Sequence, residues 1–217
     1  SLQGVVSLGD YIYTSNPEFT QMIDNSATDV VHSRVNWKGM KVESTPQTAI
    51  NVGLNFRGPN NWFASVDFNY YDRLYLSMNP MYRTEYLANE IKRIYDWNNL
   101  ETGRQKAYVV GIIDEIRQQE DLGNAYTLSA SIGKNFRIKY KYTLGFSLQV
   151  NNILNNQRIR TGGYEQMRLN KLSDPIIFPN ADGEMVITKK PTTYSRFDSK
   201  YFYMNGINYY LNIYFRF

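Results

Sequence analysis

Residues 201–217, at the end of the sequence, alternate more strictly between apolar and polar side chains than any other segment. One parity is rich in Tyr, Ile, Leu and Phe, whereas the other begins apolar and then carries amides, hydroxyls and a charge. Because successive side chains of a strand point to opposite faces, the segment predicts one long strand with an apolar and a polar face. Its length matches or exceeds the roughly 9–11 residues with which a tilted strand crosses a bilayer. A membrane strand is therefore the first hypothesis.

Composition restricts how this chain could enter a membrane. Aromatic residues make up 15% of the sequence, yet the mean hydropathy is −0.50. No window holds the roughly 20 consecutive apolar residues of a membrane helix, whereas a membrane strand needs an apolar residue only at every second position. The absence of Cys argues against a disulfide-stapled secreted domain. The net charge of +4 comes from scattered Lys and Arg, which argues against nucleic-acid binding.

Alternating segments predict an all-β fold of seven antiparallel strands. They are 2–13, 30–42, 47–57, 62–70, 125–138, 142–151 and 201–217. Tight turns are expected at 58–61 and 139–140, since the first is rich in Gly, Pro and Asn and the second leaves almost no chain between strands. Residues 73–123 and 152–200 are long interruptions. The first has apolar residues at helical spacing after a possible Thr84 cap, which predicts a helix over 84–95, whereas 108–122 fits helix or strand.

The alternation of tight turns with long loops is typical of a transmembrane antiparallel β-barrel of the outer membrane. If Phe217 lies at the periplasmic end, the turns at 58–61 and 139–140 are periplasmic and the long loops are extracellular. The same parity makes 43–46 an external turn and 15–27 an unusually long periplasmic connection. That connection disagrees with the pattern.

Aromatic side chains on the apolar parity gather at the expected strand ends. The rings at the expected periplasmic end are Phe56, Trp62, Phe136 and Tyr142 together with Phe215 and Phe217, and those at the other end are Tyr70, Tyr126, Tyr201 and Tyr203. Two such rows around a band of Val, Leu and Ile are typical of rings that lie at membrane interfaces. These residues are the predicted aromatic girdle.

Seven strands cannot close a bacterial barrel, because single-chain barrels have an even strand number and an open edge in lipid leaves backbone groups unpaired. We therefore expect residues 1–217 to be the C-terminal portion of a larger barrel. Tyr209, Leu211, Ile213, Phe215 and Phe217 would then form the terminal signature that the outer-membrane assembly machinery recognises, and their strand would close the barrel.

Five stretches, in this order, carry a family resemblance. They are TPQTA (45–49), GLNFRGPNNWFASVDFNYYDRLYLSMNP (53–80), VNNILNNQ (150–157), TGGYEQMR (161–168) and FDSKYFYMNGINYYLNIYFRF (197–217). They resemble the C-terminal part of SusC/RagA-type TonB-dependent outer-membrane receptors of the Bacteroidetes. VNNILNN followed by GGYEQ is the most specific part, whereas the last strand is a general outer-membrane signature. The resemblance implies a barrel of about 22 strands with a plug in its lumen.

The resemblance also implies a function and partners. It implies import of oligosaccharides, or of peptides, together with a SusD-like surface lipoprotein and the TonB complex, with glycan uptake as the commoner activity. The plug and the TonB-contacting box are not in this sequence, so energy coupling rests on the resemblance alone. Two alternatives remain: an outer-membrane barrel without import, such as a porin or adhesin, and a soluble β-sandwich binding module.

Catalytic and metal sites are poorly supplied. His32 is the only His and Cys is absent, so no catalytic residues, metal ligands or cofactors are expected. The adjacent carboxylates Asp114–Glu115 and Glu120–Asp121 fit solvated loops better than acid–base pairs. For ligand contact the candidates are aromatic residues of the long loops, although packing between loops would explain them as well. They are Tyr82, Tyr86, Tyr95, Trp97, Tyr164 and Tyr194.

Overall fold

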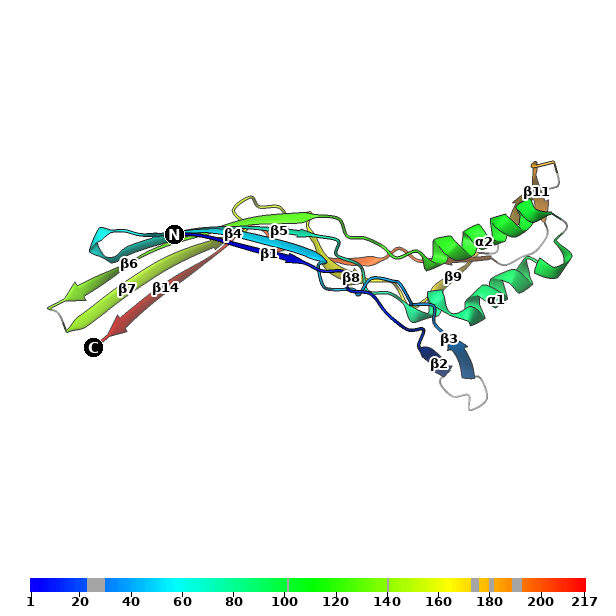
Figure 1. Ribbon diagram of the computed structural model, residues 1–217, viewed down its shortest axis with the longest axis horizontal. Helices are drawn as coiled ribbons and strands as arrows, with labels where there is room; N and C mark the ends of the chain where they lie inside the picture. Colours follow the sequence, from blue (N-terminus) through cyan, green and yellow to red (C-terminus); the bar gives the residue numbers. More distant parts are fainter. Residues whose placement is uncertain (23–29, 101, 140, 173–175, 180–181, 189–192) are drawn as a thin grey trace.

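The computed structural model describes residues 1–217 except 23–29, 101, 140, 173–175, 180–181 and 189–192. The side chains of 30, 169–172, 176–179, 185–188 and 193–194 also lie outside the described part. The molecule is elongated, with a curved sheet in one half and a pair of helices at the opposite end (Figure 1).

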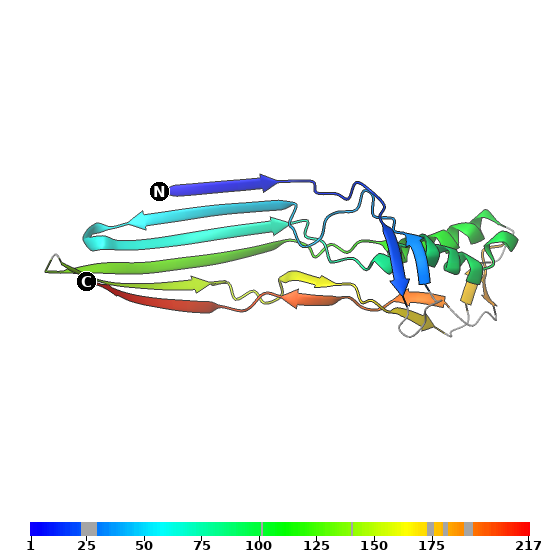
Figure 2. The same ribbon diagram turned by 90° about the horizontal axis from the view of Figure 1, so that it is seen from below.

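Six strands form one antiparallel sheet in the order β1-β4-β5-β6-β7-β14. Their bounds are β1 (Leu2–Leu8), β4 (Thr48–Arg57), β5 (Trp62–Asp72), β6 (Ala125–Ile138), β7 (Tyr142–Asn151) and β14 (Asn208–Arg216). Neighbours in space follow one another along the chain once the long excursions are skipped (Figure 2). The prediction of a chain built mainly of strands is confirmed. Among the described strands the sheet is open, with β1 and β14 at its edges, and it does not close into a barrel.

The remaining strands form four two-stranded sheets outside this sheet. They are β2 (Glu18–Met22) with β3 (Val30–Arg34), β8 (Arg160–Tyr164) with β13 (Lys200–Tyr203), β9 (Leu169–Leu172) with β12 (Thr193–Arg196), and β10 (Ile176–Pro179) with β11 (Met185–Thr188). Short 3-10 turns occur at η1 (Pro59–Asn61), η2 (Pro80–Arg83) and η3 (Trp97–Asn99). All four two-stranded sheets belong to excursions that leave the six-stranded sheet at the end facing the helices.

Two helices, α1 (Glu85–Ile94) and α2 (Gly103–Arg117), pack together within residues 73–124, the second excursion from the sheet. The predicted Thr84 cap is confirmed, since its hydroxyl accepts the Leu87 N–H at 3.1 Å. Thr102 and Gln105 form a capping box at the start of α2, which settles the ambiguous segment as helix as far as Arg117. Leu87, Ile91, Val109, Ile113 and neighbouring rings form a buried core between the helices. Within the described residues, neither helix is long and apolar enough to cross a membrane.

The predicted strand over 30–42 is wrong. Only Val30–Arg34 is extended in a ladder, and it pairs with β2 rather than with the sheet. The alternation there has a different cause, because Val35 is buried under the second excursion and Trp37 packs on the ring of Tyr13. β1 therefore lies directly beside β4, and residues 9–47 are one excursion at the helix end. The long connection expected at 15–27 thus lies at the same end as the other excursions.

The single terminal strand over 201–217 is also wrong, since β13 and β14 are separated by residues 204–207. β13 pairs with β8, whereas β14 pairs with β7. Between them, the loop after β7 satisfies the backbone: Met204 N–H donates to the Ile159 carbonyl at 3.0 Å, and Ile207 N–H donates to Asn155 Oδ1 at 2.9 Å. Local pairing with 152–164 therefore competes with continuation of the strand.

Candidate functional site

One face of the six-stranded sheet is apolar, and no other described part of the chain covers it. Rows of side chains run across it in register, such as Leu54, Val66 and Ala130, followed by Val150 and Tyr209. Leu54 is 56% exposed and Leu211 58% exposed, values normally found for polar surface residues. An apolar surface that extends over a whole sheet marks an interaction site.

Aromatic rings form a belt across this face beside the tight turns. Ring centroids lie 6.1 Å apart for Trp62 and Phe146, and 6.0 Å apart for Phe136 and Phe146. Tyr142 stacks on Phe215 at 5.8 Å. At the other end of the same face, Tyr70 lies opposite Tyr126 in the ladder.

The predicted girdle residues mostly fall in these two places. Phe56, Trp62, Phe136 and Tyr142 lie near the tight turns, and Tyr70 and Tyr126 lie at the far end. Tyr201 and Tyr203 fall in neither place, because they lie in β13, which pairs with β8 outside the six-stranded sheet. The terminal residues Tyr209, Leu211, Ile213 and Phe215 lie along the apolar face of β14, and Phe217 follows the strand. Their role in assembly stays a prediction.

The opposite face of the sheet is polar and carries hydrogen bonds between strands. Asn51 donates to Asn69 Oδ1 at 2.9 Å, and the hydroxyls of Ser65 and Ser131 lie 2.8 Å apart. Amides, hydroxyls and the Asp67 carboxylate occupy this face, which also bounds an open hollow of about 1170 Å³ near the tight turns. The sheet therefore separates an apolar surface from a water-compatible one.

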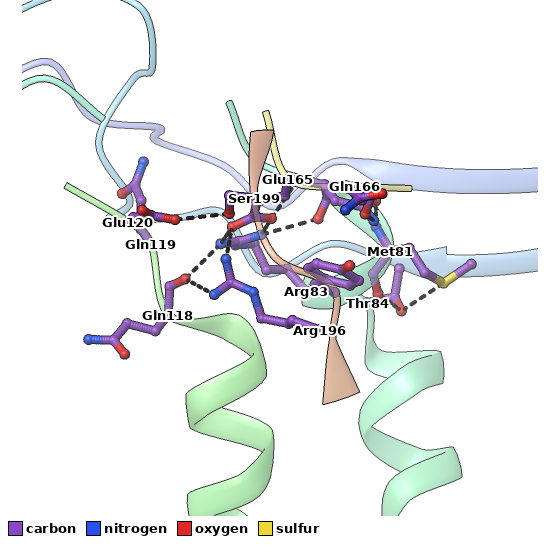
Figure 3. Close-up of polar contacts among 12 residues, drawn as sticks. Met81, Arg83, Thr84, Gln118, Gln119, Glu120, Glu165, Gln166, Arg196 and Ser199 are labelled. Atoms are coloured by element: carbon purple, nitrogen blue, oxygen red, sulfur yellow. Dashed lines mark hydrogen bonds and ion pairs between the residues drawn. The ribbon is translucent and has the colours of Figure 1, made fainter. Parts of the chain in front are cut away.

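A buried ion pair joins the excursions 73–124 and 152–207 beside the first residues of α1 and the last residues of α2. Arg83 and Glu165 are fully buried, and the guanidinium binds the carboxylate through two contacts of 2.5 and 2.7 Å. Arg196 approaches the same carboxylate at 3.0 Å, and both arginines donate to the carbonyl of Gln118. Figure 3 shows these side chains converging from different excursions. We call Arg83, Glu165, Arg196 and Gln118 the loop clamp.

Beside the loop clamp lies a hollow of about 760 Å³ lined by side chains of residues 118–121 and 196–201. Glu120 is its central acceptor, bound by Ser199 at 2.9 Å, by the Tyr201 hydroxyl and by Arg160. The hydrogen bond to Glu120, with partial burial, raises the pKa of Tyr201 above its ordinary value. The Arg160 guanidinium stacks on the Tyr201 ring at 4.1 Å. Carboxylate, guanidinium and hydroxyl groups beside Tyr201 and Phe197 suit a hydroxyl-rich or peptide ligand.

The five predicted ligand-contacting aromatics whose side chains are described do not line this hollow. Tyr82 and Tyr95 are buried in the helix core, where they pack and cannot meet an external ligand. Trp97 also packs against that core, and the ammonium groups of Lys92 and Lys106 lie over its ring.

Tyr86 and Tyr164 do not gather with these residues either. Tyr86 and Tyr164 are exposed, but Tyr164 packs on Phe202, away from α1. The side chain of Tyr194 lies outside the described residues. The five candidates whose side chains are described therefore do not form one binding surface.

Sequence reasoning missed the residues that do gather. The sequence predicts a solvated loop for Glu120, and the clamp arginines carry no local signal because their partners lie far away in the sequence. Among the described residues, no three or more His, Asp or Glu side chains lie together in a way that could hold a metal ion.

Comparison with family models, with curated proteins and with solved structures finds no match to this chain.

Proposed function

We propose that this chain is the C-terminal part of an outer-membrane import receptor of the SusC/RagA type, with the apolar face of the sheet against lipid. The observation that carries the proposal is the two-faced sheet: a continuous, exposed apolar face backed by a hydrogen-bonded polar face. In lipid, backbone groups must be paired between strands, and side chains must alternate between lipid and lumen.

The arrangement of connections supports the same proposal. The turns between β4 and β5 and between β6 and β7 are tight and lie at one end, whereas the excursions 9–47, 73–124 and 152–207 leave the other end (Figure 2). Outer-membrane barrels have short periplasmic turns and long outer loops. In the proposed receptor the helices and the loop clamp are extracellular, and the open edges pair with strands of the same parent barrel.

The hollow beside Glu120 is the proposed place where substrate meets this chain. Its carboxylate, guanidinium and ring groups suit oligosaccharide hydroxyls or peptide groups. Oligosaccharide import with a SusD-like lipoprotein and TonB follows from the sequence resemblance. A porin or adhesin would use the same sheet, but neither would consume TonB-derived energy. A change at Glu120 would not reduce uptake through a porin, and an adhesin performs no uptake.

A soluble β-sandwich would bury the apolar face against a second sheet. The four two-stranded sheets of the described chain all lie in the excursions and do not cover the apolar face, which supports lipid rather than a second sheet as the partner of that face.

Adjacent residues of β7 provide the experiment. Leu148 lies on the apolar face and Ser147 on the polar face, paired with Leu211 and Asn212 respectively. In the full-length protein, Leu148→Arg should destabilise the fold in bilayers by about 2–4 kcal/mol, whereas Ser147→Arg should cost little. Urea titration in lipid vesicles measures the difference. Equal losses for the two variants would refute a lipid-facing apolar surface.

A further inference from the structure

Basic residues gather at the tight-turn end of the sheet. At that end, the segments 55–64, 132–146 and 212–217 contain six of the 24 basic residues of the chain and none of its 20 acidic ones. The six are Arg57, Lys134, Arg137, Lys139, Lys141 and Arg216. The rest of the chain, with 18 basic and 20 acidic residues, is slightly acidic. The net positive charge of the chain therefore belongs to this end.

Lys134 is unusual because it lies on the apolar face. It stands opposite Trp62 and Phe146 in the ladder, and its ammonium lies 4.8 Å from the ring centroids of both Trp62 and Phe136. Apart from Asp72 at the far end of β5, it is the one charged side chain on that face among the described strand residues of the sheet. A Lys in the middle of a lipid-facing surface costs about 2–4 kcal/mol, but close to nothing at the interface. Its position within the aromatic belt thus suits interface depth.

Two further lysines add positive charge beside Lys134, in the turn that follows its strand. Lys139 and Lys141 flank the turn between β6 and β7, both are exposed, and Lys141 lies 5.3 Å from the Tyr142 ring centroid. In the described part of the chain, no ion pair joins Lys134, Lys139 or Lys141 to a carboxylate. Their charge is therefore left for a partner outside the described chain. Arg57, Arg137 and Arg216 have the opposite parity and belong to the polar face.

We propose that Lys134, Lys139 and Lys141, with the aromatic belt around them, bind the phosphate of anionic phospholipid headgroups in the leaflet at the tight-turn end. The inference rests on the proposed lipid contact of the apolar face and adds a lipid class and named residues to it. Aromatic rings hold the cations at headgroup depth, and the ammonium groups supply the charge that a phosphodiester complements. Each basic residue near an anionic surface strengthens binding by roughly 1 kcal/mol, which corresponds to about five-fold.

The test uses the full-length protein in phosphatidylcholine vesicles with spin-labelled phosphatidylglycerol or spin-labelled phosphatidylcholine as probes. Electron paramagnetic resonance measures the fraction of each label that is immobilised by incorporated protein. The wild type should immobilise phosphatidylglycerol several-fold more than phosphatidylcholine. In the triple variant Lys134→Gln/Lys139→Gln/Lys141→Gln the preference should vanish, and Lys→Arg at the same three positions should restore it.

The matched control removes the same charge from the same end but from the opposite face. Arg57→Gln/Arg137→Gln/Arg216→Gln should reduce the preference less than two-fold. Equal losses for the two triple variants, or an unchanged preference in the lysine variant, would overturn the inference. Loss of the preference when inorganic phosphate is added at constant ionic strength would mean that the lysines bind a free ion, and would overturn it too.

Failure of this inference and failure of the proposed function give different results. A wild-type protein that enters the vesicles without lipid preference contradicts only the headgroup site. A wild-type protein that does not enter them at all contradicts both. Each signal is normalised to protein that floats with the vesicles. If the triple variant does not incorporate, Lys139→Gln/Lys141→Gln, which changes only exposed residues beside the turn, replaces it and should also lower the preference for phosphatidylglycerol.

Discussion

At the scale of single residues, glycines on the polar face make room for aromatic rings of the neighbouring strand. A Cβ added at Gly145 would lie 2.3 Å from the ring of Tyr214, whose hydroxyl donates to Asn135 at 2.7 Å. Gly133 lies under Phe63 in the same way. Glycine in a strand normally weakens it, but here it permits a ring to lie flat over the backbone, a device that also fixes strand register.

We expect Gly145→Val to destabilise the full-length protein by about 1–3 kcal/mol, because the Tyr214 ring must leave its place. Introduced into Tyr214→Ala, the same substitution should cost far less, since the ring is already gone and Val favours strands. A double-mutant cycle from urea titrations in lipid vesicles gives the coupling energy. Additive losses would show that the ring does not determine the need for Gly145.

The second residue-scale prediction concerns the hollow beside the loop clamp. Glu120→Gln keeps the size of the side chain but weakens its hydrogen bonds to Ser199, Tyr201 and Arg160. If substrate meets this chain there, uptake of a labelled oligosaccharide by intact cells should fall about ten-fold, because one lost hydrogen bond to a charged group is worth roughly 1.5–3 kcal/mol. The amount of receptor in the membrane should stay unchanged. The control is Asp114→Asn on the exposed face of α2, which should leave uptake intact. Unchanged uptake in Glu120→Gln would remove the hollow as the place of contact.

At the scale of elements, local sequence patterns predicted those parts of the fold that depend on local interactions. β4 to β7 follow from period-two alternation, and α1 follows from the Thr84 cap with apolar residues at helical spacing. The misassigned segments are alternating stretches whose apolar residues pack in loops, as Val35 does. Alternation reports that one side of a segment is apolar, but it does not identify the surface that this side contacts. Contacts such as Arg83 with Glu165, 82 residues apart, have no local signal.

The loop clamp gives a prediction for the excursions as elements. Glu165→Gln leaves two arginines beside a neutral amide, and losing one partner of a buried ion pair costs about 3–5 kcal/mol. Hydrogen exchange should therefore become faster in 79–94 and 160–165, while amides of β5 and β6 keep their protection. The control, Glu90→Gln, breaks an exposed pair with Arg93 on α1 and should cost under about 1 kcal/mol. Unchanged exchange in both excursions after Glu165→Gln would mean that the clamp does not hold them.

At the scale of the whole molecule, all long excursions leave one end of the sheet and all tight turns lie at the other. Sequence parity predicted this for the loops after β5 and β7. For the first excursion the prediction was wrong, because the additional strand predicted at 30–42 placed residues 15–27 at the tight-turn end. Since β1 pairs directly with β4, residues 9–47 must return to the end from which they started. The structure therefore makes the separation of turns and loops more complete than the sequence alone suggested.

That difference can be measured by labelling single cysteines in the full-length protein on intact cells with a membrane-impermeant maleimide. Ser15 and Asn98 are exposed at the helix end, in the first and second excursions, and Pro59 is exposed in the tight turn after β4. Pro59 is preferred to Asn60, whose φ of 56° would strain a Cys. In the proposed receptor Ser15→Cys and Asn98→Cys should label to similar extents, and Pro59→Cys should label only after the outer membrane is permeabilised. If Ser15→Cys labels only after permeabilisation, like Pro59→Cys, the result would support a strand at 30–42 and contradict the pairing of β1 with β4. If Pro59→Cys alone labels on intact cells, the sheet has the opposite orientation in the membrane.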